Sequence, residues 1–179
     1  MFRLKVEGLQ NFPAAGKIII AANHSSYLDS MAIISAIPRR IKWLIQKGIY
    51  DLWWLKWFFF LTGMIPENGA VGKSLLFLEE GRTIGMFPEG TRSQDGKLHY
   101  GRKGAAILAL KTGAIVVPCA VRGAFEAYPR NALFPKPYPV KVLVGEPIVF
   151  RKVDNPEETE INSALDKIMS SIKSLMEIK

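Results

Sequence analysis

Short apolar runs alternate with amphipathic segments along most of this chain. Apolar runs of about five residues, rich in isoleucine and valine, are typical of buried strands. They occur at residues 17–22, 41–45, 83–87, 115–121 and 140–144. The pattern therefore predicts a sheet whose strands are largely buried.

Segments between and after these runs carry apolar residues at helical spacing. We expect one helix that begins at Ser25 or Ser26, either of which can cap it, and ends before Pro38. Further helices are expected over residues 70–80, closed by Gly81, over 104–111, stopped at Gly113, and over 156–177. Strands that alternate with helices indicate an α/β layer architecture. A chain of 179 residues fits one domain, so we expect a single domain over residues 1–179.

The charge of the chain is unevenly distributed. The formal net charge is +8, and the segment from Arg151 onward has five basic and six acidic residues, so the first 150 residues carry +9. The basic residues are scattered and form no nucleic-acid motif, which favours an anionic lipid or a phosphate group as the partner over nucleic acid. The one cysteine, Cys119, lies in an apolar run and is expected to be a buried structural thiol.

The sequence predicts contact with a membrane surface rather than a membrane span. The N-terminus lacks the apolar core of a signal peptide, and no stretch reaches the roughly 20 apolar residues that span a bilayer. Residues 52–66 are rich in aromatic side chains around Lys56, which suits the bilayer interface, although a core helix would use such residues too. The expected membrane contacts are Trp53, Trp54, Trp57, Phe58 and Phe59. We therefore expect a cytoplasmic, peripherally membrane-associated protein.

Two polar clusters come directly after predicted buried strands, where ligands bind in open α/β sheets. The first is Asn23-His-Ser-Ser-Tyr-Leu-Asp29. A carboxylate at Asp29 that bonds one nitrogen of His24 would leave the other nitrogen free to act as a general base. The alternative is a loop histidine beside an acid that merely favours the positive end of a helix.

The second cluster is Phe87-Pro-Glu-Gly-Thr-Arg-Ser93. Gly90 permits close backbone approach, Thr91 offers a hydroxyl, and the planar guanidinium of Arg92 suits a phosphate. Glu89 would either accept hydrogen bonds from substrate hydroxyls or anchor Arg92. The alternative for the whole cluster is an ordinary turn with a surface ion pair.

The two clusters together resemble the motifs of the glycerophospholipid acyltransferase family, which includes the 1-acylglycerol-3-phosphate acyltransferases. The family's His-x4-Asp motif matches residues 24–29, and its Phe-Pro-Glu-Gly-Thr-Arg motif matches residues 87–92 without a substitution. Val117-Pro118 and Lys103-Gly104-Ala105 resemble further blocks of the family. The resemblance implies a layered α/β/α domain around a mixed, largely parallel sheet.

The same resemblance implies an O-acyltransferase that works without an acyl-enzyme. His24 would be the general base and Asp29 its orienting partner, while Glu89, Gly90, Thr91 and Arg92 would hold the acceptor. The acceptor would be a lysolipid, most simply 1-acylglycerol-3-phosphate, and the donor acyl-CoA or acyl carrier protein. No cofactor is expected, and no metal site either, since His24 and His99 are the two histidines and no cysteine–histidine spacing resembles a zinc site.

One departure from the family pattern concerns the acceptor. The family's second block ends in an arginine associated with the acceptor phosphate, and here glycine stands at about that place, Gly69. Either another cation compensates, for which the candidates are Lys73, Arg102 and Lys103, or the acceptor is a different lysolipid or an amino-lipid. A lipid esterase or thioesterase and a non-catalytic lipid-binding module are the alternatives from other classes.

Overall fold

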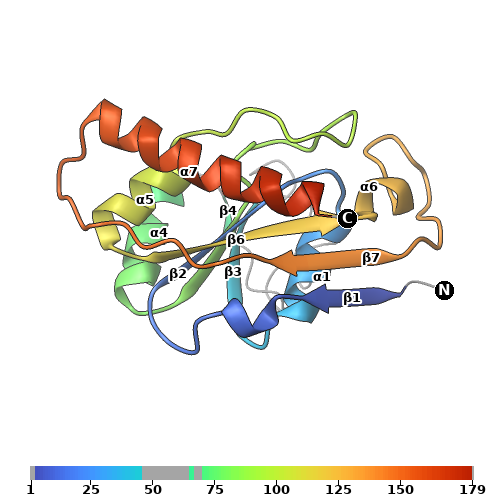
Figure 1. The fold of residues 1–179 in the computed structure, drawn as a ribbon, viewed down its shortest axis with the longest axis horizontal. Helices are drawn as coiled ribbons and strands as arrows, with labels where there is room; N and C mark the ends of the chain where they lie inside the picture. The colour runs from blue at the N-terminus through green and yellow to red at the C-terminus, as the bar shows by residue number, and fades with distance from the viewer. Residues whose placement is uncertain (1–2, 46–64, 67–69, 179) are drawn as a thin grey trace.

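The computed structural model describes residues 3–45, 65–66 and 70–178. Within these residues seven strands form one sheet in the order β1-β7-β6-β2-β5-β3-β4 (Figure 1). The strands are β1 (Leu4–Glu7), β2 (Ile18–Ala22), β3 (Ile41–Ile45), β4 (Ile65–Pro66), β5 (Thr83–Met86), β6 (Ile115–Arg122) and β7 (Val140–Val144). Neighbouring strands run parallel except β6 and β7, which are antiparallel. This confirms the mixed, largely parallel sheet.

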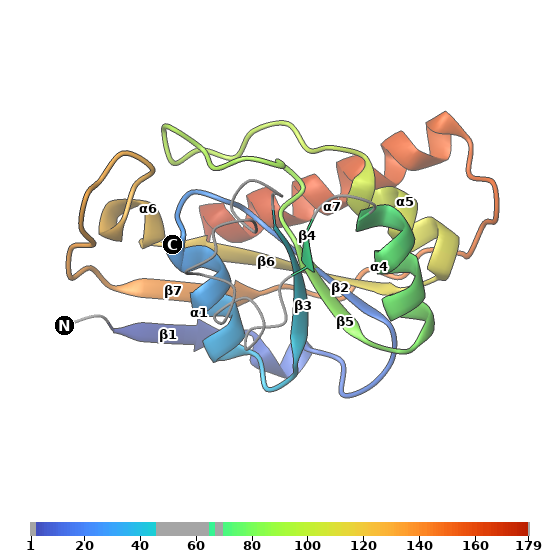
Figure 2. The same ribbon diagram turned by 180° about the vertical axis from the view of Figure 1, so that it is seen from behind.

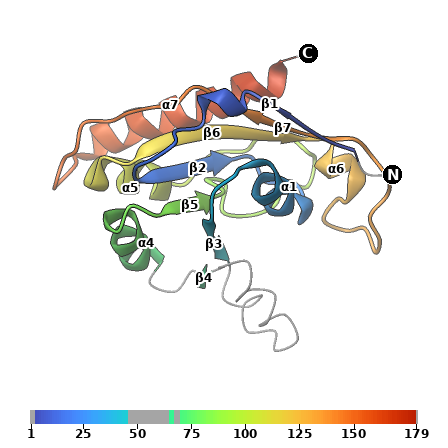
Figure 3. The same ribbon diagram turned by 90° about the horizontal axis from the view of Figure 1, so that it is seen from below.

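Helices cover both faces of the sheet. The helices of the described residues are the 3-10 helix η1 (Leu9–Asn11) and the α-helices α1 (Leu28–Ala36), α4 (Ala70–Glu79), α5 (Gly104–Thr112), α6 (Ala124–Ala127) and α7 (Glu158–Glu177). Helix α7 crosses in front of the sheet in Figure 1, whereas α1 lies in front of it when the molecule is seen from behind (Figure 2). Seen from below, the sheet lies between α7 and α1 (Figure 3). The predicted α/β/α layering is confirmed.

The alternation of side chains along β2 explains the two layers of core. Ile18 and Ile20 are fully buried on the face that packs against α1 and α6. Ile19 and Ala21 are fully buried on the opposite face, against α5 and α7. Successive strand side chains point to opposite faces, so a strand that is apolar at every position belongs in the middle of such a sandwich.

Most predicted elements are confirmed, with several differences. The N-cap position of α1 is Tyr27 rather than Ser25 or Ser26, although the Ser26 hydroxyl accepts a hydrogen bond from the Leu28 N–H. The last helix begins at Glu158, because Glu157 and Glu160 form a capping box there, and not at residue 156. Strand β1, the 3-10 helix η1 and helix α6 were not predicted: β1 is a mostly exposed edge strand, η1 has three residues and α6 has four.

The single domain over residues 1–179 stays a prediction.

Within the described residues no helix combines the length and the apolar character needed to cross a bilayer. The expected membrane contacts Trp53, Trp54, Trp57, Phe58 and Phe59 lie outside the residues that the structure describes.

Candidate active site

Both polar clusters lie at the carboxyl edge of neighbouring parallel strands. Residues 23–29 follow β2 and residues 87–93 follow β5, and β2 pairs with β5 in parallel. A backbone hydrogen bond from the Ser93 N–H to the His24 carbonyl (2.7 Å) joins the two segments. The sheet therefore brings together two motifs that are far apart in the sequence, as predicted.

His24 and Asp29 form a hydrogen-bonded pair. The distance from His24 Nδ1 to Asp29 Oδ2 is 2.9 Å, and the Asp29 side chain is fully buried. An ionised carboxylate only accepts hydrogen bonds, so this contact assigns the proton to Nδ1 and leaves Nε2 with a free lone pair. The geometry is that of a general base and the group that orients it.

The backbone holds the Asp29 carboxylate in place. Asp29 Oδ2 accepts hydrogen bonds from the backbone N–H groups of Ser25 (2.6 Å) and Ser26 (2.7 Å). Both groups belong to the turn before α1, where backbone N–H groups have no partner within the helix and attract negative charge. Asp29 Oδ1 is buried and has no hydrogen-bond partner among the described residues. Asp29 is thus both an acid in the first turn of α1 and the hydrogen-bond partner of the His24 ring.

The His24 ring is also fixed by stacking. It lies on the ring of Phe87 with a centroid distance of 3.9 Å and an interplanar angle of 5°. Phe87 in turn stacks on Trp43 of β3, with centroids 4.8 Å apart. The imidazole keeps 18% of its side-chain surface exposed. A ring held by one face and by Nδ1 can present Nε2 to a substrate with little rotational freedom.

Glu89 joins the two motifs through the backbone. Its Oε1 accepts a hydrogen bond from the His24 N–H (2.7 Å) and its Oε2 accepts one from the His99 N–H (3.0 Å). The residue is 5% exposed, and this burial raises the pKa of the carboxyl above its usual range, against the lowering effect of the two N–H donors. The alternative that Glu89 anchors Arg92 is therefore wrong, since its two oxygens bind backbone groups of other residues.

Arg92 stacks on the ring of Tyr27. Its Cζ lies 3.6 Å from the ring centroid, and its Nη2 donates a hydrogen bond to the Tyr27 hydroxyl (2.9 Å). Arg92 Nη1 is buried and has no hydrogen-bond partner among the described residues. Tyr27 belongs to the His24 motif, so the first cluster positions the cation of the second. Sequence reasoning gave Tyr27 no role.

The other residues predicted to bind the acceptor are Gly90, Thr91 and Lys103, and each has different surroundings. Gly90 has φ +69°, a conformation that favours glycine, and a Cβ there would lie 2.6 Å from Nε of the exposed Arg102 side chain, which would have to shift. Thr91 is exposed next to it. The ammonium of Lys103 lies 2.5 Å from a Glu158 carboxylate oxygen at the start of α7. Of the three candidate compensating cations, the structure brings Arg102 to the second cluster.

Two further contacts at this edge were missed by sequence reasoning. The Asn23 amide donates to the Val121 carbonyl (3.0 Å) and its oxygen accepts the Val121 N–H (2.7 Å), so it extends the pairing of β2 with β6 by one residue. The Ser26 hydroxyl donates to the Tyr128 carbonyl (2.7 Å). These bonds tie the His24 segment to the segment that follows β6.

The side chains of Cys119 and His99 do not contact the His24–Asp29 pair. Cys119 is fully buried, and desolvation raises the pKa of its thiol to about 12, which confirms the structural role predicted for it. The His99 side chain is 54% exposed and bonds Asp95 at 2.9 Å.

A cavity of about 430 Å³ lies beside the His24 segment and is lined by Asn23, Ser25 and Arg122 among others, but His24 itself is not part of its lining.

Comparison with known protein families identifies the family of the chain. The family model described as Acyltransferase matches residues 3–122. The chain therefore belongs to the acyltransferase family, which confirms the resemblance seen in the motifs.

Several curated relatives carry a more specific name. The chain is similar to 1-acyl-sn-glycerol-3-phosphate acyltransferase LPAT1, chloroplastic, of Arabidopsis thaliana, with 28% identity over 178 residues, 92% of this chain and 50% of the relative. It is similar to 1-acyl-sn-glycerol-3-phosphate acyltransferase of Borreliella burgdorferi, with 25% identity over 182 residues, 97% of this chain and 73% of the relative. The chain spans about half the length of the Arabidopsis relative and of a second chloroplast relative, BAT2 of Brassica napus (47%).

A solved structure shares the fold. The crystal structure of the 1-acyl-sn-glycerophosphate (LPA) acyltransferase PlsC from Thermotoga maritima matches with a TM-score of 0.80 and 24% sequence identity, over 99% of this chain and 73% of that chain. At this identity the likeness establishes the fold, and the chemistry is argued from the residues.

Proposed function

We propose that this chain transfers a fatty acyl group from an acyl thioester to the hydroxyl of 1-acylglycerol-3-phosphate. The single observation that carries the proposal is the buried His24–Asp29 pair, whose 2.9 Å bond leaves Nε2 of the histidine free. The relatives named as 1-acyl-sn-glycerol-3-phosphate acyltransferases support the choice of acceptor. The donor would be acyl-CoA or acyl carrier protein.

The reaction follows from the position of the base. Nε2 of His24 takes the proton of the acceptor hydroxyl while that oxygen attacks the thioester carbonyl carbon. The carbonyl oxygen becomes the oxyanion of a tetrahedral intermediate, and the imidazolium is stabilised by Asp29. When the intermediate collapses, the carbon–sulfur bond breaks and the thiolate receives the proton from His24. The products are the ester and the free thiol, with the base restored.

The serines beside His24 do not compete as nucleophiles. The Ser26 hydroxyl donates its proton to the Tyr128 carbonyl and accepts a hydrogen bond from the Leu28 N–H, so this proton is not directed at His24. Ser25 is 3% exposed. An acyl-serine step needs a hydroxyl that faces both the base and the thioester, which supports direct transfer to the acceptor.

The acceptor phosphate would be held by Arg92, and Arg102, which lies against Gly90 of the same cluster, would be the second cation. Arg92 is fixed by the Tyr27 ring and keeps Nη1 buried without a partner among the described residues. Arg102 lies against the backbone of Gly90. Two guanidinium groups suit a phosphate monoester, which carries close to two negative charges. Gly69, where the family has an arginine, lies outside the described residues.

The test is a transfer assay with purified protein, labelled acyl-CoA or acyl carrier protein, and a panel of lysolipids. His24→Ala should abolish transfer to 1-acylglycerol-3-phosphate. His99→Ala is the matched control, since its exposed ring contacts Asp95 and its backbone bond to Glu89 survives the change. Fatty acid released without acceptor would indicate a thioesterase, and transfer confined to another lysolipid would reject the proposed acceptor. Acyl transfer by His24→Ala at the wild-type rate would reject the assignment of His24 as the general base.

A further inference from the structure

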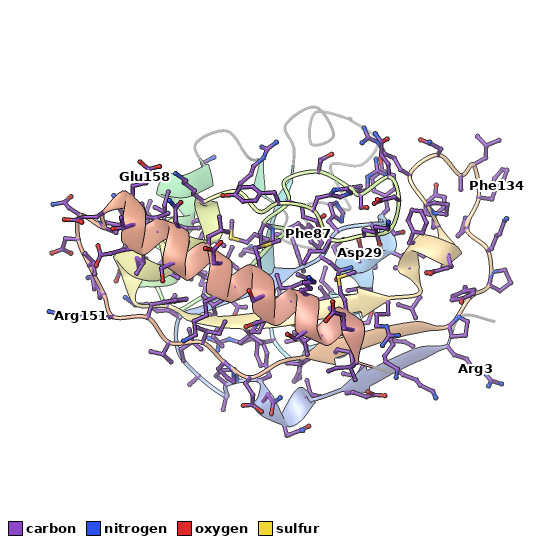
Figure 4. All side chains as sticks on the ribbon, turned by 45° about the horizontal axis from the view of Figure 1, so that its top comes forward. Arg3, Asp29, Phe87, Phe134, Arg151 and Glu158 are labelled. Atoms are coloured by element: carbon purple, nitrogen blue, oxygen red, sulfur yellow. The ribbon has the colours of Figure 1, made fainter. Side chains whose placement is uncertain are left out.

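The loop between α6 and β7, residues 128–139, exposes two large apolar side chains at its tip. Leu133 is 86% exposed and Phe134 is 79% exposed, and Tyr100 is the one other large apolar or aromatic residue of the described chain at this level. Figure 4 shows Phe134 projecting from the edge of the molecule, beyond α6, whereas Asp29 lies inside. Single exposed apolar residues are common on protein surfaces, but an adjacent pair this exposed indicates a contact surface.

The loop is held firmly and is joined to the active-site segment. The Lys136 N–H donates to the Ala127 carbonyl (2.7 Å), and the Ala132 N–H donates to the Pro129 carbonyl (3.1 Å). At its base, Ser26 and Pro129 form an isolated antiparallel bridge. Ser26 lies two residues after His24, so the base of the loop adjoins the His24 segment.

The charges beside the tip select the kind of partner. Arg130 and Lys136 flank the apolar pair and are exposed, and residues 128–139 contain no acidic residue. Neither cation forms an ion pair within the described residues. Apolar side chains flanked by cations match a bilayer interface that carries anionic lipid, where each cation strengthens binding about fivefold.

The proline content of the loop fits the same surface. Pro135, Pro137 and Pro139 have no N–H donor. Backbone donors that enter the interface without a partner are unfavourable, and irregular backbone is excluded from the hydrocarbon core for that reason. A proline-rich tip can therefore lie at headgroup level with its two apolar side chains reaching the acyl chains.

We infer that Leu133 and Phe134 insert into the surface of an anionic bilayer, with Arg130 and Lys136 on the lipid headgroups, and that this contact places the His24 segment at the membrane. The inference depends on the proposed function only in that the acceptor would be a lipid. It concerns a different part of the chain from the aromatic segment 52–66, and it can be tested without any turnover.

The test uses a fluorescent label at the tip. Cys119 is fully buried and the pKa of its thiol is about 12, so a single added cysteine is the one thiol that reacts in the folded protein. Phe134→Cys and, as the matched control, Tyr100→Cys (79% exposed) are labelled with an environment-sensitive nitrobenzoxadiazole dye. They are then mixed with vesicles of phosphatidylcholine and phosphatidylglycerol. The label at residue 134 should shift to shorter wavelength and be quenched by spin-labelled acyl chains, and the label at residue 100 should not.

Sedimentation with the same vesicles measures the contribution of each group. Leu133→Ser/Phe134→Ser should lower the vesicle partition coefficient about tenfold or more. Arg130→Gln/Lys136→Gln should lower the partition coefficient about 25-fold for anionic vesicles and leave the partition coefficient for neutral vesicles unchanged. An unshifted label at residue 134 in sedimented protein would overturn the inference, as would equal shifts at both labels. A shift that appears without vesicles as the protein concentration rises would overturn it in favour of a second copy of the chain.

Discussion

Replacing Asp29 by Asn isolates the role of its charge, because the change keeps the shape of the side chain. Three donors converge on Asp29 Oδ2: the His24 ring and the backbone N–H groups of Ser25 and Ser26. An amide nitrogen cannot accept these bonds, so the amide oxygen should occupy the Oδ2 position. The proton of His24 then stays on Nδ1, and Nε2 remains available as the base.

The expected effect is the loss of a negative charge beside the imidazolium of the transition state. Two unit charges about 4 Å apart interact with about 4 kcal/mol at an effective dielectric constant of about 20. The His24 side chain is 18% exposed, so we expect solvent to reduce this to about 2–4 kcal/mol. That range corresponds to a decrease of roughly 30- to 1,000-fold in kcat/KM.

The measurement is the initial rate of acyl transfer, with thermal unfolding as the check on the fold. Asp29→Ala is a poor substitute, because it leaves two buried N–H groups without an acceptor at about 1–3 kcal/mol each. A rate for Asp29→Asn within about threefold of wild type would refute the role of the charge. A decrease well beyond about 10⁴-fold at an unchanged Tm would refute the argument that the tautomer is retained.

Three further predictions concern the second motif and its contacts. Glu89 has a raised folded-state pKa, so between pH 4.5 and that higher pKa the native state binds more protons and the free energy of unfolding falls as pH rises. Glu89→Gln should lack this slope in urea titrations, and parallel pH profiles for the two proteins would contradict the assignment. Gly90→Ala should lower stability by about 1–3 kcal/mol in thermal unfolding, from the positive φ and the contact with Arg102. When Gly90→Ala is combined with Arg102→Ala, the loss of stability caused by Gly90→Ala should be smaller. An equal loss of stability with and without the Arg102 side chain would exclude a contribution from its contact with residue 90. Tyr27→Phe keeps the ring under Arg92 but removes the 2.9 Å bond, so the KM for the acceptor should rise about threefold to tenfold with kcat unchanged. A change confined to kcat would show that Tyr27 acts on the chemistry instead.

The sequence predicted the framework of the site because its signals are local. Apolar runs marked the strands β2 and β5, and the rule that ligands bind at the carboxyl ends of strands located both clusters. The His24–Asp29 contact also follows from local geometry, since one turn of chain separates the two residues. Residues 17–22 and 83–87 thus placed both clusters at one edge of the sheet, whereas the role of His24 as a base came from the resemblance to the family motifs.

The contacts between the clusters were not predictable in the same way. Glu89 binds a backbone N–H that is 65 residues away in sequence, and Asn23 binds a backbone group 98 residues away. Every residue type has backbone groups, so the sequence does not reveal which residue such a side chain binds. The stacking of Arg92 on Tyr27 leaves only a weak signal, an aromatic residue within the His-x4-Asp motif.

The structure changes how the Phe-Pro-Glu-Gly-Thr-Arg motif should be understood. The resemblance implies that Glu89 helps to hold the acceptor; in the structure both of its carboxylate oxygens accept hydrogen bonds from backbone N–H groups, one of them that of His24. Phe87, the first residue of the motif, supports the His24 ring by stacking. Two of the six motif residues therefore support His24, the proposed base, and the proposed binding of a phosphate falls mainly to Arg92. A substitution at Phe87 or Glu89 would then lower kcat more than it raises the KM for the acceptor, whereas a substitution at Arg92 would do the reverse. That contrast follows from geometry alone, and it separates the motif into a part that positions the base and a part that binds the acceptor.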